Sequence, residues 1–333
     1  MLRALVLAGM GLLCASAWAQ GRIDHVIVYS KALAGNLIGD SAERDIYVYL
    51  PPSYDSASDR RYPVVYLLHG YGLRAERWMN FADVNAGADA AIAAGAQEMI
   101  IVNPDAYNFF DGSMYSSSVT TGDWERFLAE ELVEHIDSHY RTLAQRESRG
   151  LAGHSMGGYG TLRLGMKYPQ VFSALHPMSA CCLVDGAEPG ENFALAADLT
   201  TREAVDALRY PSKSTLARAA AWSPNPASPP LFLDLPADGV AVDAPVQAKW
   251  RANSIINMLD QHTFNLRRYT AIQLDVGDAD NLLATNRQLH EKLDAAGVVH
   301  TFEVYEGDHN NRVAQRIREN VLPFFSRHLQ GPK

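Results

Sequence analysis

Cysteine is scarce in this sequence. Only Cys14, Cys181 and Cys182 occur among 333 residues, and Cys14 falls in an N-terminal segment that we expect to be removed. Adjacent cysteines close only a strained ring, so a disulfide between the remaining two would be unusual. We therefore expect a fold that does not depend on disulfides, and we interpret Cys181 and Cys182 as packed thiols without a catalytic role.

Basic residues are also in deficit. Lys and Arg number 29 against 38 Asp and Glu, which gives a formal net charge of −9. Such a chain has no electrostatic footprint for nucleic acid or anionic lipid. Hydrophobic residues make up 47% and charged residues 20%, which is too apolar for a disordered chain. The composition predicts a globular protein with no nucleic-acid partner.

Long apolar runs are confined to the N-terminus. Arg3 is followed by an apolar stretch at residues 4–15 and by Ala17-Trp18-Ala19, a small-residue cleavage site. This pattern predicts a signal peptide at 1–19, removed after Ala19, and hence a secreted or periplasmic protein with no membrane span. The alternative is an uncleaved anchor.

Metal and nucleotide motifs are missing as well. The sequence has no H-E-x-x-H, no paired cysteine spacing, no P-loop, and no G-x-G-x-x-G after its first strand. We therefore predict no metal and no cofactor.

What is present is an alternation of strand-like and helix-like segments, typical of a mostly parallel sheet with helices on both faces. Apolar runs at 63–68 and 99–102 predict central strands. Segments 24–30 and 45–50 alternate polar and apolar residues and predict an antiparallel edge. The other predicted strands are 148–153, 171–178, 271–276 and 301–305, and the predicted helices are 83–94, 124–140, 156–168, 281–295 and 312–328, the last interrupted near Pro323.

Residues 180–270 break this alternation and are rich in proline. We interpret them as an insertion of loops and short helices over the carboxyl edge of the sheet, without a domain-sized core of its own. Residues 20–333 are then expected to form one catalytic domain.

A candidate nucleophile lies in the G-x-S-x-G sequence at 153–157, which is centred on Ser155. A predicted strand precedes it, a predicted helix follows it, and glycines occupy 157, 158 and 160. That context is typical of a nucleophile elbow, a strained turn that exposes the serine hydroxyl. A chance occurrence of the pattern is the alternative.

An oxyanion hole is predicted from two positions. The sequence HGYG at 69–72 follows a central strand, where a turn can direct the N–H of Tyr71 toward the serine. Met156, the residue after the nucleophile, supplies the second N–H. The alternative for 69–72 is a plain glycine-rich turn.

The base must be one of eleven histidines. His309 follows the last predicted strand, and the chain order in an elbow hydrolase is serine, acid, then histidine. We therefore predict His309 as the base and interpret His69 and His154 as structural.

The acid should follow strand 271–276, where Asp278 and Asp280 both qualify. Its role is to orient the imidazole and stabilise the imidazolium. Spacing alone leaves the choice open.

These motifs together resemble the putative-esterase family of α/β-hydrolases, which includes esterase D-like enzymes, feruloyl and acetyl-xylan esterases, siderophore esterases and mycolyltransferases. The resemblance covers roughly residues 44–329. It rests on YPVVYLLHGYGL at 62–73, segments 104–118 and 124–140, LAGHSMGGYGTLRLGMKYPQVF at 151–172, the acid loop at 277–280 and EGDH at 306–309.

The resemblance implies an α/β-hydrolase fold with Ser155 as nucleophile, His309 as base, and Tyr71 and Met156 as oxyanion donors. Relatives carry the acid three residues after the glycine of its loop, which here is Asp280. The chain departs from the family most in its insertion at 180–270.

The aromatic loop at 105–119 is relevant to the substrate because it follows a central strand. It either lines an acyl or sugar pocket or packs under the insertion. The first hypothesis is a secreted carboxylic-ester hydrolase acting on feruloyl, acetyl or other carbohydrate-linked esters, or on small-molecule esters. The alternatives are an acyltransferase that uses a sugar or alcohol acceptor, a siderophore esterase and a serine peptidase. The complete Ser-Asp-His set argues against a non-catalytic binding protein. The sequence leaves the oligomeric state open.

Overall fold

The structure, a computed structural model, describes residues 20–186, 190–199, 201–238 and 240–332. The predicted signal peptide at 1–19 lies outside the described residues. Within the described part of the chain, no helix is long and apolar enough to cross a membrane.

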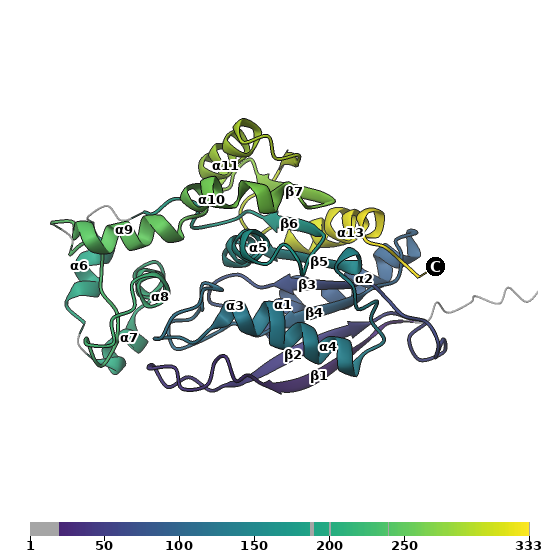
Figure 1. The fold of residues 1–333 in the computed structure, drawn as a ribbon, viewed down its shortest axis with the longest axis horizontal. Coiled ribbons are helices and arrows are strands. Elements are labelled where there is room, and N and C mark those ends of the chain that lie inside the picture. Colours follow the sequence, from purple (N-terminus) through teal and green to yellow (C-terminus); the bar gives the residue numbers. More distant parts are fainter. Residues whose placement is uncertain (1–19, 187–189, 200, 239, 333) are drawn as a thin grey trace, which may run out of the picture.

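The predicted α/β architecture is confirmed by a single eight-stranded sheet with the strand order β1-β2-β4-β3-β5-β6-β7-β8 (Figure 1). As the alternating segments predicted, β1 and β2 form an antiparallel edge, and β2 also pairs antiparallel with β4. All other pairs are parallel. The strands are β1 (Arg22–Tyr29), β2 (Glu43–Leu50), β3 (Val64–Leu68), β4 (Ile100–Pro104), β5 (Arg149–His154), β6 (Ala174–Met178), β7 (Ala271–Gly277) and β8 (Thr301–Tyr305).

Helices cover both faces of the sheet, and this explains the apolar runs. Along β3, Val64, Tyr66 and Leu68 belong to one buried cluster, whereas Val65 and Leu67 belong to the other. Neighbouring side chains point to opposite faces of a strand, so a strand covered twice must be apolar throughout. One face is covered by α1 (Ala75–Phe81), α2 (Val84–Ala93), α12 (Val313–Arg316) and α13 (Leu322–His328), and the other by α3 (Trp124–Arg126), α4 (Leu132–His139), α5 (Met156–Lys167), α10 (Ile255–Leu266) and α11 (Leu283–Ala295).

Three predicted elements differ in detail. The helix predicted at 124–140 contains a π-helical turn, Phe127–Glu131, which no feature of the sequence pattern indicated. A second π-helical turn, Ile317–Val321, precedes Pro323, where the missing N–H prevents the regular hydrogen-bond pattern. The strand predicted from 171 begins at Ala174 because the N–H of Val171 closes a turn onto the carbonyl of Tyr168.

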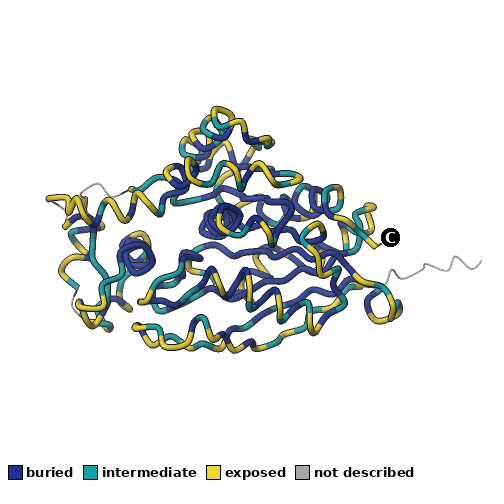
Figure 2. The backbone as a smooth tube through the Cα atoms, viewed as in Figure 1, coloured by how far each residue is buried: buried dark blue, intermediate teal, exposed yellow. Residues whose placement is uncertain are grey.

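The insertion contributes α6 (Glu191–Ala197), α7 (Arg202–Ala207), α8 (Ser212–Trp222), α9 (Ala244–Asn253) and α10. Helices α6 to α9 lie beyond one end of the strands, at the left of Figure 1. Figure 2 shows that α8 is buried along most of its length, like α5. The ring of Trp222 on α8 lies 5.3 Å from Trp250 and 5.6 Å from Tyr159 of α5, centroid to centroid. These aromatic residues belong to the same apolar cluster as one face of the sheet.

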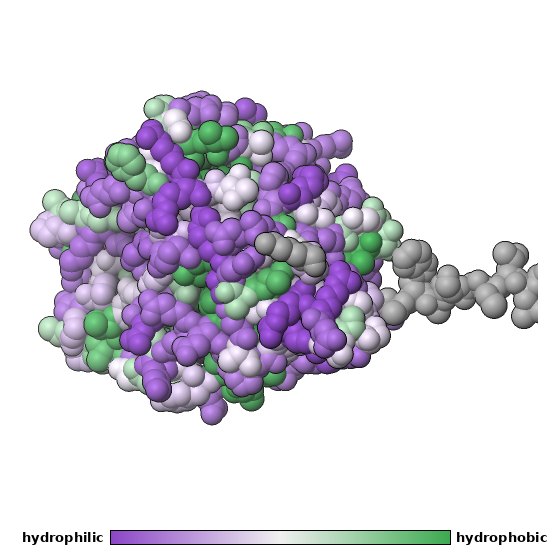
Figure 3. All heavy atoms as spheres, turned by 45° about the vertical axis from the view of Figure 1, so that its right-hand side comes forward, coloured by the Kyte–Doolittle hydropathy of each residue, from purple (hydrophilic) through white to green (hydrophobic). Residues whose placement is uncertain are grey.

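The face drawn in Figure 3 is mostly hydrophilic, and its apolar side chains occur in small scattered groups.

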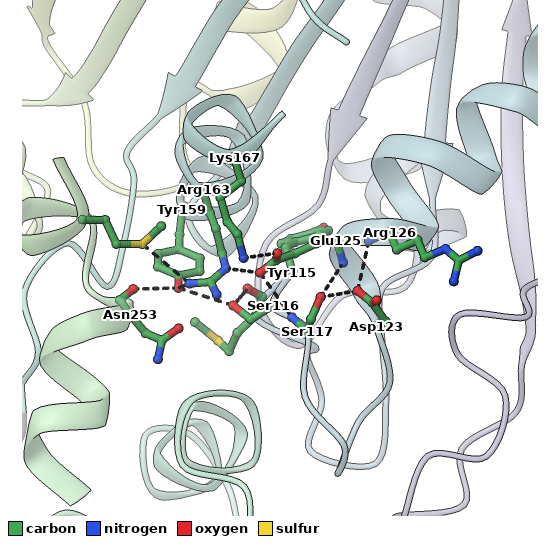
Figure 4. Close-up of polar contacts among 12 residues, drawn as sticks. Tyr115, Ser116, Ser117, Asp123, Glu125, Arg126, Tyr159, Arg163, Lys167 and Asn253 are labelled. Carbon is green, nitrogen blue, oxygen red and sulfur yellow. Dashed lines mark hydrogen bonds and ion pairs between the residues drawn. The ribbon is translucent and has the colours of Figure 1, made fainter. Parts of the chain in front are cut away.

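A buried polar network fixes α5 from its middle to its end (Figure 4). The Glu125 carboxylate of α3 accepts from Arg163 Nε at 2.6 Å and also pairs with Lys167. The Tyr159 hydroxyl accepts from Arg163 and donates to the carbonyl of Asn253, each at 2.9 Å. Burial alone would raise the pKa of Glu125, but the two cations hold that pKa below its ordinary value. The network ties α5 to α3 and to the insertion.

Candidate active site

Ser155 occupies the turn between β5 and α5 in a strained conformation, with φ 58° and ψ −111°. A positive φ is uncommon for a residue other than glycine and marks a site held by its surroundings. The neighbouring glycines make the turn possible. A Cβ added at Gly153 would lie 2.4 Å from the carbonyl oxygen of Gly157, and one at Gly157 would lie 2.2 Å from the Leu68 carbonyl oxygen.

Three loops at the carboxyl ends of β5, β7 and β8 bring Ser155, Asp280 and His309 together. The distance from Ser155 Oγ to His309 Nε2 is 3.0 Å, and that from His309 Nδ1 to Asp280 Oδ2 is 2.8 Å. The Asp280 side chain is fully buried, whereas that of His309 is 27% exposed. The arrangement is a hydroxyl, a base and an orienting acid in one hydrogen-bonded chain.

The two candidate acids have different partners. Burial disfavours the charged form of Asp280, but hydrogen bonds from His309 and from the Leu282 N–H outweigh it, so the pKa of Asp280 lies below its ordinary value. Asp278 instead accepts a 2.9 Å hydrogen bond from the Gly307 N–H. Asp278 therefore joins the acid loop to the loop that carries His309, and Asp280 contacts the imidazole.

His154 and His69 support the site through backbone contacts. His154 Nε2 lies 2.7 Å from the carbonyl oxygen of His309, and the ring stacks on Trp78. Burial and the nearby His309 lower the pKa of His154 to about 4, so at neutral pH it is uncharged and donates through Nε2–H. His69 accepts from the Ala106 N–H at 2.8 Å. Both histidines are thus built into the scaffold of the site.

The two predicted oxyanion donors face the same space as the serine. Tyr71, Met156 and Ser155 line one cavity, and a Cβ added at Gly70 would lie 3.6 Å from Ser155 Cβ. Among the described residues, the N–H groups of Tyr71 and Met156 have no hydrogen-bond partner. Two such N–H groups, on residues that line the same cavity as Ser155, are suited to stabilise a developing oxyanion.

Two cavities meet at Ser155 and share His309, Tyr71 and Tyr210 in their walls. The smaller, of about 290 Å³, is largely apolar, with Met114, Met156, Leu183, Val184, Pro211 and Leu282 among its lining residues. The larger, of about 810 Å³, has polar and apolar walls in similar proportion, and its polar side chains include Tyr107, Asp111, Arg209, Lys213 and Asn310. An ester with one apolar and one polar half would match this division.

The aromatic loop at 105–119 both lines a cavity and packs into the protein, the two roles that its sequence left open. Tyr107 lines the larger cavity, whereas Phe110 and Tyr115 are fully buried in the core.

Sequence reasoning missed the position of the cysteine pair. Cys181 and Cys182 are free thiols that line the smaller cavity. The N–H of Cys181 also donates to the carbonyl of Ser155 at 3.1 Å. Their place shortly after β6 was the available signal, because ligands bind at the carboxyl ends of the strands in such sheets.

Comparisons with known proteins identify the family of this chain. A family model described as "Putative esterase" matches residues 41–314. Esterase Rv1288 of Mycobacterium tuberculosis is 35% identical over 128 residues, which are 37% of this chain and 26% of that protein. An endo-1,4-beta-xylanase/feruloyl esterase of Xylanibacter ruminicola is 33% identical over 130 residues, 38% of this chain and 18% of that protein. The chain thus spans about a quarter or less of the length of these relatives.

A solved structure of a ferulic acid esterase is similar over almost the whole fold. It is 25% identical, with a TM-score of 0.69, and the match covers 93% of this chain and 99% of that one. With a family model that extends over most of its length, the chain belongs to the putative-esterase family.

Proposed function

We propose that this protein is a serine carboxylic-ester hydrolase. The observation that carries the proposal is the continuous contact from Ser155 Oγ through the His309 imidazole to Asp280, at 3.0 and 2.8 Å. Membership of the esterase family and the esterase names of the relatives support it.

In the proposed mechanism, His309 Nε2 takes the hydroxyl proton of Ser155 as Oγ attacks the ester carbonyl. The N–H groups of Tyr71 and Met156 stabilise the oxyanion. His309 then gives the proton to the leaving alcohol, and the acyl group remains on Ser155. Water repeats the sequence, releases the carboxylic acid and restores the serine.

We propose esters of aromatic or short acyl groups with carbohydrate or other polar alcohols as the substrate class. The smaller, apolar cavity is suited to an acyl group, and the larger one offers hydroxyl, carboxylate and ammonium groups to a polyhydroxy alcohol. The feruloyl-esterase names of the relatives support this choice. We further propose that residues 1–19 are a signal peptide and that the remaining chain acts as one secreted or periplasmic catalytic domain.

Steady-state kinetics on hydroxycinnamate methyl esters and on p-nitrophenyl esters of increasing chain length test the proposal. We expect Ser155→Ala to lose nearly all turnover. Ser214 provides the matched control because it also lines the smaller cavity and its hydroxyl donates a hydrogen bond to the Pro211 carbonyl. Ser214→Ala should keep the wild-type kcat on the shortest ester. Full activity in Ser155→Ala would overturn the proposal. Transfer to an added alcohol in preference to water would identify an acyltransferase instead.

A further inference from the structure

A second group of chemically reactive side chains lies away from Ser155. His290 and Asp294 are one helical turn apart on α11, and His300 directly precedes β8. One possible ligand atom from each of the three lies within 4.8 Å of the others. None of them lines either cavity at Ser155, so the proposed hydrolysis leaves this cluster unexplained.

His300 is already oriented as a ligand. Its Nδ1 lies 2.8 Å from the carbonyl oxygen of Val298. Because a carbonyl only accepts, Nδ1 carries the proton and Nε2 is left with a free lone pair. The side chain is 1% exposed, so its surroundings hold the ring in this orientation. Metal-binding histidines are usually held this way, with the second nitrogen donating to a carbonyl or carboxylate.

His290 faces that lone pair. Its Nδ1 lies 2.8 Å from His300 Nε2, and its ring stacks on Phe302 with centroids 4.8 Å apart. Without an ion, a proton on His290 Nδ1 bridges the two nitrogens. Two nitrogens that each bind zinc at about 2.0–2.1 Å in a tetrahedral site lie about 3.3 Å apart. The pair must therefore open by only about half an ångström to admit an ion.

Asp294 supplies the negative charge. Its carboxylate is 63% exposed and lies 3.6 Å from His290 Nε2 and 3.9 Å from His300 Nδ1, beside the two nitrogens that do not face each other. The exposed side chain must therefore rotate to reach an ion between His290 Nδ1 and His300 Nε2. The cluster thus offers two imidazoles on its inner side and one carboxylate at the surface.

We propose that His290, Asp294 and His300 form a binding site for a divalent transition-metal ion, namely zinc. Two imidazoles and one carboxylate favour zinc over magnesium or calcium, which prefer all-oxygen ligands. Water completes the tetrahedron. The ion joins the second half of α11 to the start of β8. These two elements lie on the segment that runs from Asp280 to His309, so the ion stabilises the unit that carries both the acid and the base.

Calorimetric titration of the full-length chain, stripped of metal by chelation and dialysis, with zinc chloride tests this site. We expect one zinc per chain and a melting temperature that rises by about 5 °C at a zinc concentration a hundredfold above the dissociation constant. His290→Gln and Asp294→Asn should each weaken binding by about tenfold or more. Cobalt in place of zinc should give the visible absorption of a tetrahedral ion in the wild type only.

A second close histidine pair, on α4, provides the matched control. His135 and His139 stack on α4 with ring centroids 4.1 Å apart, and the described residues place no third ligand beside them. His135→Asn/His139→Asn should bind zinc as the wild type does. Ester hydrolysis should be retained in folded His290→Gln, which separates this proposal from the proposed function. No saturable binding at millimolar zinc, or undiminished binding by His290→Gln, would overturn the site.

Discussion

Replacing Asp280 by Asn keeps the size of the side chain but removes its charge and reverses one hydrogen bond. In the wild type, His309 Nδ1–H donates to Asp280 Oδ2 over 2.8 Å, and the second carboxylate oxygen accepts from the Leu282 N–H at 2.8 Å. In Asp280→Asn the amide nitrogen can donate to Nδ1 instead. The proton then moves to Nε2, which can no longer accept the proton of Ser155.

The expected loss follows from that change of tautomer. Neutralising the acid of such a triad lowers kcat by roughly 10³–10⁴, which corresponds to about 4–5.5 kcal/mol of transition-state stabilisation. Asp278→Asn provides the matched comparison. Its remaining carbonyl oxygen can still accept from the Gly307 N–H, now 2.9 Å from Oδ1. We therefore expect less than a tenfold loss of rate and about 1 kcal/mol lower stability.

The assay is kcat on one activated ester for the wild type and both variants, with urea unfolding to measure the free energy of unfolding. Equal losses of rate in the two variants, or a larger loss in Asp278→Asn, would refute the assignment of Asp280 as the orienting acid.

Three further predictions concern the surroundings of the site. In the unfolded chain His154 protonates near the ordinary histidine pKa of 6.5, whereas in the folded protein burial lowers that pKa to about 4. The free energy of unfolding should therefore fall by up to about 3 kcal/mol as the pH drops between these values. Urea unfolding at several pH values should show a shallower fall in His154→Gln. Arg163→Met leaves the buried Glu125 carboxylate with one cation fewer, so we expect the free energy of unfolding to be about 3–5 kcal/mol lower. A loss below 1 kcal/mol would contradict a structural role for the Glu125–Arg163 ion pair. Cys181→Ala/Cys182→Ala keeps the backbone hydrogen bond to the nucleophile's carbonyl, so kcat on a short ester should stay near the wild-type value, while a collapse of kcat with the fold intact would reveal a role for the thiols.

Much of the sheet could be predicted from the sequence because its order is local. The apolar runs in β3 and β4 and the alternation in β1 and β2 indicate how many faces of each strand are covered. The elbow could be located for a similar reason: only glycine fits at 153 and 157, where other backbone approaches within 2.4 Å of an added Cβ.

The rest depended on contacts between distant segments. The position after β7 made both Asp278 and Asp280 candidates for the acid but could not distinguish them. Their roles differ because Asp278 bonds to Gly307 and Asp280 to His309, which lie about 30 residues later in the chain. The cavity wall formed by Cys181, Cys182 and Tyr210 was hidden for the same reason, since the insertion has no simple periodicity that indicates which side chains turn toward Ser155.

The most direct test of the central claim is acid-quenched mass spectrometry during turnover of a slow ester. We predict that the peptide containing Ser155 gains the mass of the acyl group within the first turnover, and that this adduct is absent in Ser155→Ala. Turnover without any covalent adduct, or an adduct on another residue, would contradict the proposed mechanism.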